Sequence, residues 1–160
     1  MRIDKDFKEF IELLNEHKVQ YLVIGGYAVN FHGYPRYTKD IDFWLWMTKP
    51  NIKKLIEAIK EFGFGELNLE IEDFMTTDNI IQLGYEPYRI DLLVDVEGID
   101  FEECYERRIK AELDGTEVKF LSLQDLIRAK RAAGRLQDLA DAEQLEKLEK
   151  KKDKNQTDNK

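Results

Sequence analysis

Two aspartates stand at the head of a segment that is apolar on both faces. The segment Ile41–Trp46 reads Ile-Asp-Phe-Trp-Leu-Trp and follows Asp40 directly, so Asp40 and Asp42 flank one isoleucine. A run so rich in β-branched and aromatic residues predicts a central strand of a sheet. Because side chains alternate along a strand, both carboxylates lie on one face, with Cα atoms about 7 Å apart. Buried carboxylates need partners, and Mg²⁺ is held in proteins by a few such oxygens. The pair therefore favours a metal site over a solvated strand end.

A glycine pair ends the preceding apolar segment. Tyr21–Ile24 predicts a short buried strand that stops at Gly25 and Gly26, and residues 27–32 can form a short helix after it. Glycines let backbone N–H groups turn toward a ligand, and a helix N-terminus favours anions. The pair therefore suits a triphosphate, although two glycines equally mark an ordinary tight turn. The chain contains neither a P-loop motif nor a dinucleotide-binding glycine motif.

A third acid could complete a two-metal site. The segment Tyr88–Val96 predicts another central strand that carries Asp91 and Asp95 on one face. Asp91 is the stronger candidate because it lies near the start of the strand, at a depth similar to that of Asp40 and Asp42. Asp95 lies toward the far end, where a surface acid or a turn is expected.

Two further residues join the face of the aspartates if the extended stretch begins at Arg36. Arg36 and Thr38 then alternate with Asp40 and Asp42. An arginine in that place could neutralise phosphate charge beside the metal. Both residues are therefore candidates for nucleotide binding.

Lys130 is a charge on an apolar helix face. A capping pattern at Ser122 opens a helix to about Ala133, and Lys130 shares a face with Leu126 and Ile127. Such a lysine either extends its amine to solvent or meets an anion. The second alternative makes Lys130 a contact for nucleotide phosphates.

The rest of the chain alternates helices and strands. Apolar spacing and capping residues predict helices over Lys5–His17 and Ile52–Ile59, and a last helix through Leu139, Ala142 and Leu145. Strand and turn signals predict a strand over 79–84 and a hairpin at Asp114-Gly115. This order predicts an α+β fold, with a mixed β-sheet flanked by helices and two C-terminal helices. We expect one domain over residues 1–148 and a charged, disordered tail over residues 149–160.

Composition narrows the class of protein. The 160 residues are 42% hydrophobic, contain no apolar run that could span a bilayer, and include one cysteine, Cys104. The acidic N-terminus lacks the features of a signal peptide, so a cytoplasmic protein without membrane contact is expected. Residues 1–145 carry 19 basic and 29 acidic side chains, which argues against broad nucleic-acid binding.

The glycine pair, the triplet Asp40-Ile41-Asp42 and the downstream Asp91 resemble the nucleotidyltransferase superfamily that includes DNA polymerase β. The stretches 36–42, 122–130 and 135–141 are similar to its small prokaryotic branch, which includes nucleotidyltransferases akin to toxins of abortive-infection and toxin–antitoxin systems. The resemblance covers residues 5–148 and implies a nucleotidyltransferase-like fold.

The resemblance also implies an activity and its parts. Asp40, Asp42 and Asp91 would bind Mg²⁺ or Mn²⁺ and carry catalysis, while Gly25, Gly26, Arg36, Thr38 and Lys130 would bind a nucleoside triphosphate such as ATP. A nucleoside monophosphate would pass to a hydroxyl of a protein, an RNA end such as that of tRNA, or a small molecule, with release of pyrophosphate. A cognate toxin or antitoxin is an implied partner. The alternative is a non-catalytic nucleotide-binding or antitoxin-like protein that retains the fold.

Overall fold

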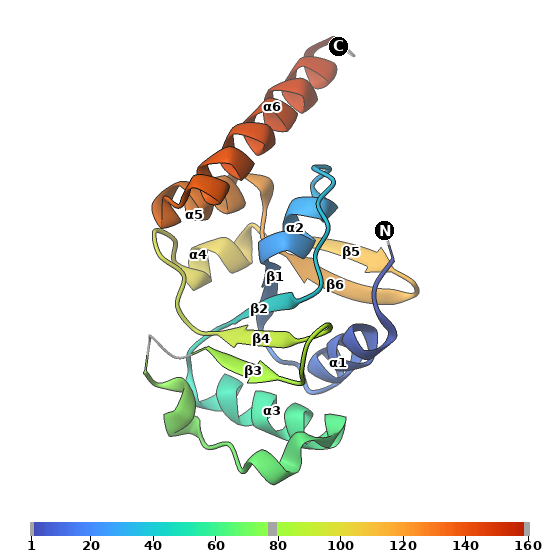
Figure 1. Cartoon of the computed structure of the whole chain (residues 1–160), viewed down its shortest axis with the longest axis vertical. Helices are drawn as coiled ribbons and strands as arrows, with labels where there is room; N and C mark the ends of the chain where they lie inside the picture. The colour runs from blue at the N-terminus through green and yellow to red at the C-terminus, as the bar shows by residue number, and fades with distance from the viewer. Residues whose placement is uncertain (1, 77–79, 159–160) are drawn as a thin grey trace.

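A six-stranded mixed sheet organises the chain. The computed structural model describes residues 2–76 and 80–158, with strands in the order β3-β4-β2-β1-β6-β5 (Figure 1). The strands are β1 (Tyr21–Ile24), β2 (Ile41–Leu45), β3 (Ile81–Leu83), β4 (Ile90–Leu93), β5 (Ile109–Leu113) and β6 (Thr116–Phe120). Parallel pairing joins β1 to β6 and β2 to β4, whereas the other neighbours are antiparallel. The predicted α+β fold with a mixed sheet is confirmed.

The helices begin and end where local chemistry allows. They are α1 (Lys5–Glu16), α2 (Gly25–Phe31), α3 (Lys49–Ile59), α4 (Phe101–Glu106), α5 (Leu123–Ala133) and α6 (Leu136–Asp158). Asp4 caps α1 by accepting from the N–H of Asp6, and Thr48 caps α3 by accepting from the N–H of Asn51. Short helical turns follow α3 as η1 (Lys60–Phe64), η2 (Gly65–Leu67) and η3 (Ile71–Phe74).

The central strands are buried, as their composition predicts. All four residues of β1 are buried, and Phe43 and Trp44 of β2 are at most 2% exposed. Phe10 of α1 packs edge-on against Phe43, with ring centroids 5.4 Å apart. Burial of these large side chains provides most of the driving force for folding. The sheet is therefore a rigid base for any side chain at the ends of β2 and β4.

Three predicted strands are shorter than their sequence pattern. The extended stretch from Arg36 joins the sheet only at Ile41, and β4 ends at Leu93 although the pattern continues to Val96. β3 begins at Ile81, and Asn79 of the predicted segment lies outside the described residues. Apolar alternation continues past the last paired residue, because loop side chains also pack against the core. Asp95 is exposed, as predicted for a residue beyond the strand.

The hairpin and the α5 cap follow their sequence signals. Asp114 and Gly115 have φ angles of 50° and 82°, as the turn between β5 and β6 requires. Ser122 caps α5 by accepting a hydrogen bond from the N–H of Asp125, 3.2 Å away. Gly134, with φ of 69°, ends α5 in the left-handed region.

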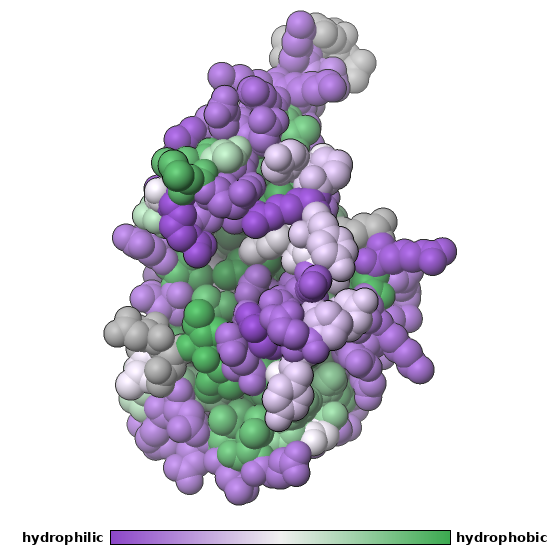
Figure 2. All heavy atoms as spheres, in the orientation of Figure 1, coloured by the Kyte–Doolittle hydropathy of each residue, from purple (hydrophilic) through white to green (hydrophobic). Residues whose placement is uncertain are grey.

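The C-terminal helix is longer than expected. Instead of a disordered tail from residue 149, α6 continues to Asp158, and it extends away from the sheet (Figure 1). Figure 2 shows hydrophilic residues covering this end of the molecule. The segment lacks Gly and Pro, and its Glu, Lys, Leu and Gln residues favour a helix even without packing. Residues 159–160 lie outside the described residues, and one domain over 1–148 stays a prediction. In the part of the chain that is described, no helix is long and apolar enough to cross a membrane.

Candidate active site

The parallel pairing of β2 with β4 brings two of the predicted acids together. Asp42 and Asp91 are opposite each other in this pairing, and Ile24 at the end of β1 is opposite Asp42 on its other side. Asp91 is buried, and Asp42 is half-buried. Burial, then the charges of Asp91 and Asp40, raise the pKa of Asp42 to about 7. The site therefore concentrates negative charge that a bound cation would relieve.

The glycine pair has a steric reason that the sequence does not reveal. A Cβ at Gly25, whose φ is +67°, would lie 2.3 Å from Oδ2 of Asp42. A Cβ at Gly26 would lie 2.8 Å from Oγ1 of Thr38. Real Cβ atoms do not approach other atoms so closely, so each glycine makes room for a side chain of the site. The backbone of the pair thus lies directly against Asp42 and Thr38.

Arg89 is the residue that sequence reasoning missed. Its Nε lies 2.7 Å from Oδ1 of Asp91, and its Nη2 lies 3.2 Å from Oδ2 of Asp40. Its backbone N–H also donates to Oδ1 of Asp40, and its Nη1 lies 3.0 Å from Oε1 of Glu86. The sequence pattern could have identified Arg89, because side-chain alternation along the predicted strand places it on the same face as Asp91, two residues later.

A polar cavity of about 430 Å³ opens at these acids. Its walls contain six of the predicted site residues, which are Gly26, Arg36, Thr38, Asp40, Asp42 and Asp91. Lys39 and Glu86 also line it. Arg36 and Thr38 line the same cavity as the aspartates, but they reach it from an irregular segment and not from a paired strand. Their role in nucleotide binding stays a prediction.

Gly25 and Lys130 line a second cavity, of about 320 Å³, which also reaches Asp42. The amine of Lys130 lies 3.4 Å from Oδ1 of Asp138 and 3.1 Å from Oδ2 of Asp141. Its side chain is 13% exposed, so it neither extends to solvent nor lacks an anion. Lys130 lies on α5, and α6 supplies both carboxylates that hold it.

Asp141 links Lys130 to Arg36. Its side chain is fully buried, and Oδ2 is ion-paired with Nη1 of Arg36 as well as with Lys130. Oδ1 accepts a hydrogen bond from Gln137. Asp138 is likewise shared, between Lys130 and Arg135. Burial opposes ionisation of Asp138, but hydrogen bonding from Arg135 and the charge of Lys130 outweigh it and lower the pKa of this carboxyl. A buried charge network therefore ties the polar cavity to α5 and α6.

The donor set suits a divalent cation, although its present arrangement is not a ready metal site. Carboxylate oxygens are the ligands that Mg²⁺ and Mn²⁺ prefer, and Asp42 carries a raised pKa that a cation would reverse. Among residues 2–76 and 80–158, no group of three or more acidic, histidine or cysteine side chains is placed to hold a metal ion. Arg89 pairs with two of the three acids, so a metal would have to replace its guanidinium.

Comparisons with solved structures identify the same fold in other proteins. A candidate nucleotidyltransferase from Thermotoga maritima aligns with a TM-score of 0.57 and 16% identity, covering 91% of each chain. The lincosamide antibiotic adenylyltransferase LnuA, bound to lincomycin, aligns with a TM-score of 0.57 and 15% identity, over 92% of this chain and 98% of LnuA. An antigenic nucleotidyltransferase-like protein from Paracoccidioides brasiliensis gives 0.52 and 14%, over 92% of this chain and 78% of that protein.

A comparison with curated protein sequences gave no significant match. The model of one protein family, described as a nucleotidyltransferase of unknown function (DUF6036), matches residues 1–156. This match covers the sheet, both cavities and most of α6. The chain therefore belongs to the DUF6036 family of nucleotidyltransferases and has the nucleotidyltransferase-like fold.

Proposed function

We propose that this protein is a Mg²⁺-dependent nucleotidyltransferase that moves a nucleoside monophosphate from a nucleoside triphosphate to a hydroxyl group. The observation that carries the proposal is the pairing of Asp42 with Asp91 on neighbouring parallel strands, beside Asp40. Burial, and then the charges of Asp91 and Asp40, raise the pKa of Asp42 to about 7, so the ionised carboxylate destabilises the fold unless a cation is bound beside it. A cation that also binds phosphate oxygens meets this requirement.

The residues of the polar cavity divide into two chemical groups. Asp40, Asp42 and Asp91 would hold Mg²⁺ or Mn²⁺, which supplies positive charge to phosphate oxygens during the displacement. Gly26, Arg36 and Thr38 lie across the same cavity and offer a close backbone, a guanidinium and a hydroxyl to the triphosphate. Arg36 is held by Asp141, so its position is fixed before a nucleotide binds.

The chemistry is a displacement at the α-phosphorus. The acceptor hydroxyl oxygen forms a bond to this phosphorus, and the bond from the phosphorus to the bridging oxygen of pyrophosphate breaks. Pyrophosphate leaves with the electron pair of that bond. Asp91 is our candidate for receiving the proton of the hydroxyl, because it lies beside Asp42 and lines the polar cavity.

The candidate acceptors are hydroxyl groups of a protein, of an RNA end or of a small molecule. The acidic body, with a net charge of −10 over residues 1–145, disfavours long nucleic acid. The likeness to an adenylyltransferase that binds lincomycin supports a small hydroxyl compound as one candidate.

Label transfer tests the proposal. The protein is incubated with each α-³²P-labelled nucleoside triphosphate, Mg²⁺ or Mn²⁺ and cell extract, and the labelled products are separated by size. We expect label on one class of molecule, and its loss in Asp42→Asn, which keeps the shape of the side chain. Equal labelling by the wild type and Asp42→Asn with all four nucleotides would refute the proposal.

A second candidate is a nucleotide-binding protein without transfer, such as an antitoxin-like partner of another protein. The ion pairs of Arg89 with Asp40 and Asp91 favour it, since they neutralise two acids without a metal. Tight binding of a nucleoside triphosphate without transfer of label, measured in the same preparations by calorimetry, would support this alternative.

A further inference from the structure

Strand β5 forms an open edge of the sheet. It is the last strand in the order β3-β4-β2-β1-β6-β5, at the opposite end from β3 (Figure 1). A two-residue turn joins β5 to β6, which makes the flanking residues Leu113 and Thr116 a hydrogen-bonded pair. Alternation along the ladder then points the N–H and C=O groups of Lys110 and Glu112 away from β6. In the part of the chain that the structure describes, no backbone hydrogen bond from another segment reaches these groups.

The charged side chains of this edge face like charges inside the hairpin. Lys110 is opposite Lys119 in the pairing of β5 with β6, and Glu112 is opposite Glu117. Like charges directly opposite each other destabilise a strand pair. Lys110 and Glu112 are both exposed, and among residues 2–76 and 80–158 neither has an ion-pair partner. The edge therefore offers one unpaired cation and one unpaired anion on the same strand face.

The segment Ile109–Leu113 is complementary to itself. When two copies run antiparallel about Ala111, Lys110 of one lies opposite Glu112 of the other. Residues directly opposite project to the same face of an antiparallel pair, so each lysine meets a carboxylate. Shifting one strand by two residues would instead oppose Lys110 to Lys110, or Glu112 to Glu112. Charges on an edge strand usually discourage pairing, whereas these select a single register.

The backbone fits the same register. Lys110 and Glu112 carry the outward N–H and C=O groups, and this register places the two residues opposite each other. Residues so placed exchange both N–H···O bonds. A two-fold axis at Ala111 repeats the pair, so the contact closes at two copies. We infer that two copies of this protein associate through their β5 edges, which joins their sheets into one continuous sheet.

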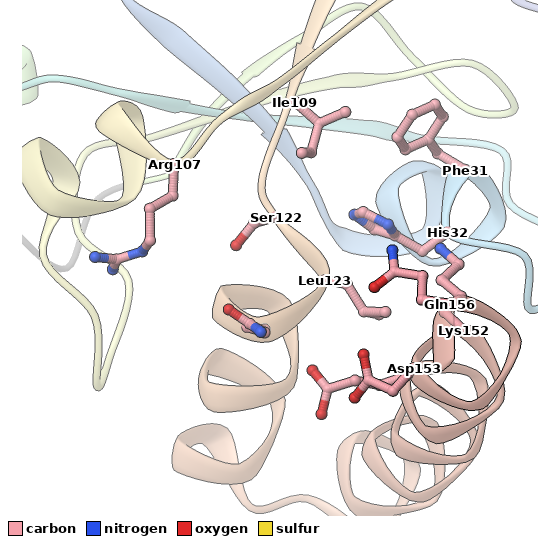
Figure 3. Close-up of a pocket in the computed structure, with 11 residues that line it drawn as sticks. Phe31, His32, Arg107, Ile109, Ser122, Leu123, Lys152, Asp153 and Gln156 are labelled. Carbon is pink, nitrogen blue, oxygen red and sulfur yellow. The ribbon is translucent and has the colours of Figure 1, made fainter. Parts of the chain in front are cut away.

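The other face of β5 adds apolar contact to this pairing. Ile109 is 40% exposed and lines a cavity of about 570 Å³ together with Phe31 and His32 of the α2 end (Figure 3). In the paired register, Ile109 is opposite Leu113 of the second copy, and Ala111 is opposite its own equivalent. Aliphatic side chains that meet in this way leave water, which favours association. Pairing thus neutralises charges on one face and covers apolar surface on the other.

Reversal of single charges tests the pairing. In Lys110→Glu the edge carries two acids, and in Glu112→Lys it carries two lysines, so each variant repels its own copy. A mixture of the two variants is complementary again, because every acid meets a lysine. Each change also removes a like-charge pair inside the hairpin, so neither variant should melt at a lower temperature than the wild-type monomer. Lys53→Glu, at an exposed position of α3, is the control with the same change in net charge as Lys110→Glu.

Sedimentation velocity up to about 0.5 mM protein measures the oligomeric state, which covers dissociation constants in the micromolar range. We expect a wild-type dimer, a dissociation constant at least about tenfold higher in either edge variant, and a heterodimer in their mixture. Lys53→Glu should match the wild type. The backbone amides of Lys110 and Glu112 should exchange hydrogen more slowly in the dimer than in dilute monomer.

A wild type that stays monomeric over this range would overturn the inference. So would a dimer that both edge variants retain, a mixture of the variants that fails to associate, or a dimer in which the two amides exchange as in the monomer. None of these results depends on nucleotidyl transfer, so the pairing and the proposed function stand or fall separately.

Discussion

Nε of Arg89 lies 2.7 Å from Oδ1 of Asp91, while Nη2 of the same guanidinium lies 3.2 Å from Oδ2 of Asp40. One cation thus joins the two acids that flank Asp42. In the metal-free protein it performs part of the charge compensation that a divalent ion would provide. Arg89 would therefore compete with a metal ion for these acids.

Removal of this guanidinium should raise metal affinity. In Arg89→Gln, Asp40 and Asp91 lose a cation, so we expect Mn²⁺ to bind about tenfold more tightly, which corresponds to about 1.4 kcal/mol. Calorimetric titration or Mn²⁺ electron paramagnetic resonance measures the change. Lys39→Gln, which removes an exposed cation of the same cavity, should change the affinity much less. Weaker Mn²⁺ binding in Arg89→Gln would show that Arg89 orients the acids for the metal and does not compete with it.

The raised pKa of Asp42 predicts how stability depends on pH. The folded protein keeps this proton up to about pH 7, whereas the unfolded carboxyl releases it near its ordinary value of 3.8. Because the folded state binds more protons in this window, the stabilising effect is present below about pH 4 and is lost as the pH rises to 7.

Asp42→Asn removes the titrating group. The difference in unfolding free energy between this variant and the wild type therefore isolates the contribution of Asp42 from that of acids elsewhere in the chain. The free energy of unfolding of this variant, relative to wild type, should rise by on the order of 2–4 kcal/mol between pH 4 and pH 8 in metal-free buffer. Urea denaturation at four pH values measures it. A constant difference between the two proteins across this range would mean that Asp42 titrates normally.

Gly25 should tolerate no side chain. Gly25→Ala combines a φ of +67° with a Cβ only 2.3 Å from Oδ2 of Asp42, so the carboxylate must move. Gly115→Ala is a matched control, since Gly115 has a φ of +82° but nothing within 4 Å of its added Cβ. We expect Gly115→Ala to cost about 1 kcal/mol of stability and Gly25→Ala clearly more, together with weaker Mn²⁺ binding. Equal costs measured by urea denaturation would argue against close packing of Asp42 on the glycine.

Asp141 should matter far more than a surface acid. It is fully buried and holds both Arg36 and Lys130, so Asp141→Asn leaves Arg36 without its carboxylate and Lys130 with Asp138 alone, and should cost about 3–5 kcal/mol. Glu143→Gln, on the exposed side of the same helix, breaks a 3.8 Å pair with Lys147 and should cost less than about 1 kcal/mol. Thermal denaturation compares the two, and similar melting temperatures would contradict the assigned network.

The sequence revealed those parts of the site that depend on local periodicity. Alternation placed Asp40 and Asp42 together, and the apolar neighbours of Asp91 identified its strand as central. The parallel pairing that brings Asp42 beside Asp91 depends on a register between distant segments, which no local pattern specifies. Local patterns therefore indicated which residues lie in the site, but not how the paired strands bring them together.

Other features could not be predicted because they arise from tertiary contacts. The glycine pair looked like a phosphate turn, but its tight approach to Asp42 and Thr38 appears only when the strands are assembled. Of the two predicted outcomes for Lys130, the structure shows contact with an anion, but the anions are the carboxylates of Asp138 and Asp141, which α6 brings to it. Arg89 was overlooked because one arginine in a strand has many ordinary explanations.

The central claim, transfer of a nucleoside monophosphate, is tested most directly by the position of the label. The wild type is incubated with Mg²⁺, cell extract and the same nucleoside triphosphate labelled with ³²P at either the α- or the γ-phosphate. Our account predicts that the acceptor gains the α-label only, that the γ-label appears in pyrophosphate, and that Asp42→Asn and Asp91→Asn abolish both. Transfer of the γ-label to the acceptor, or α-labelling that persists in both variants, would contradict it.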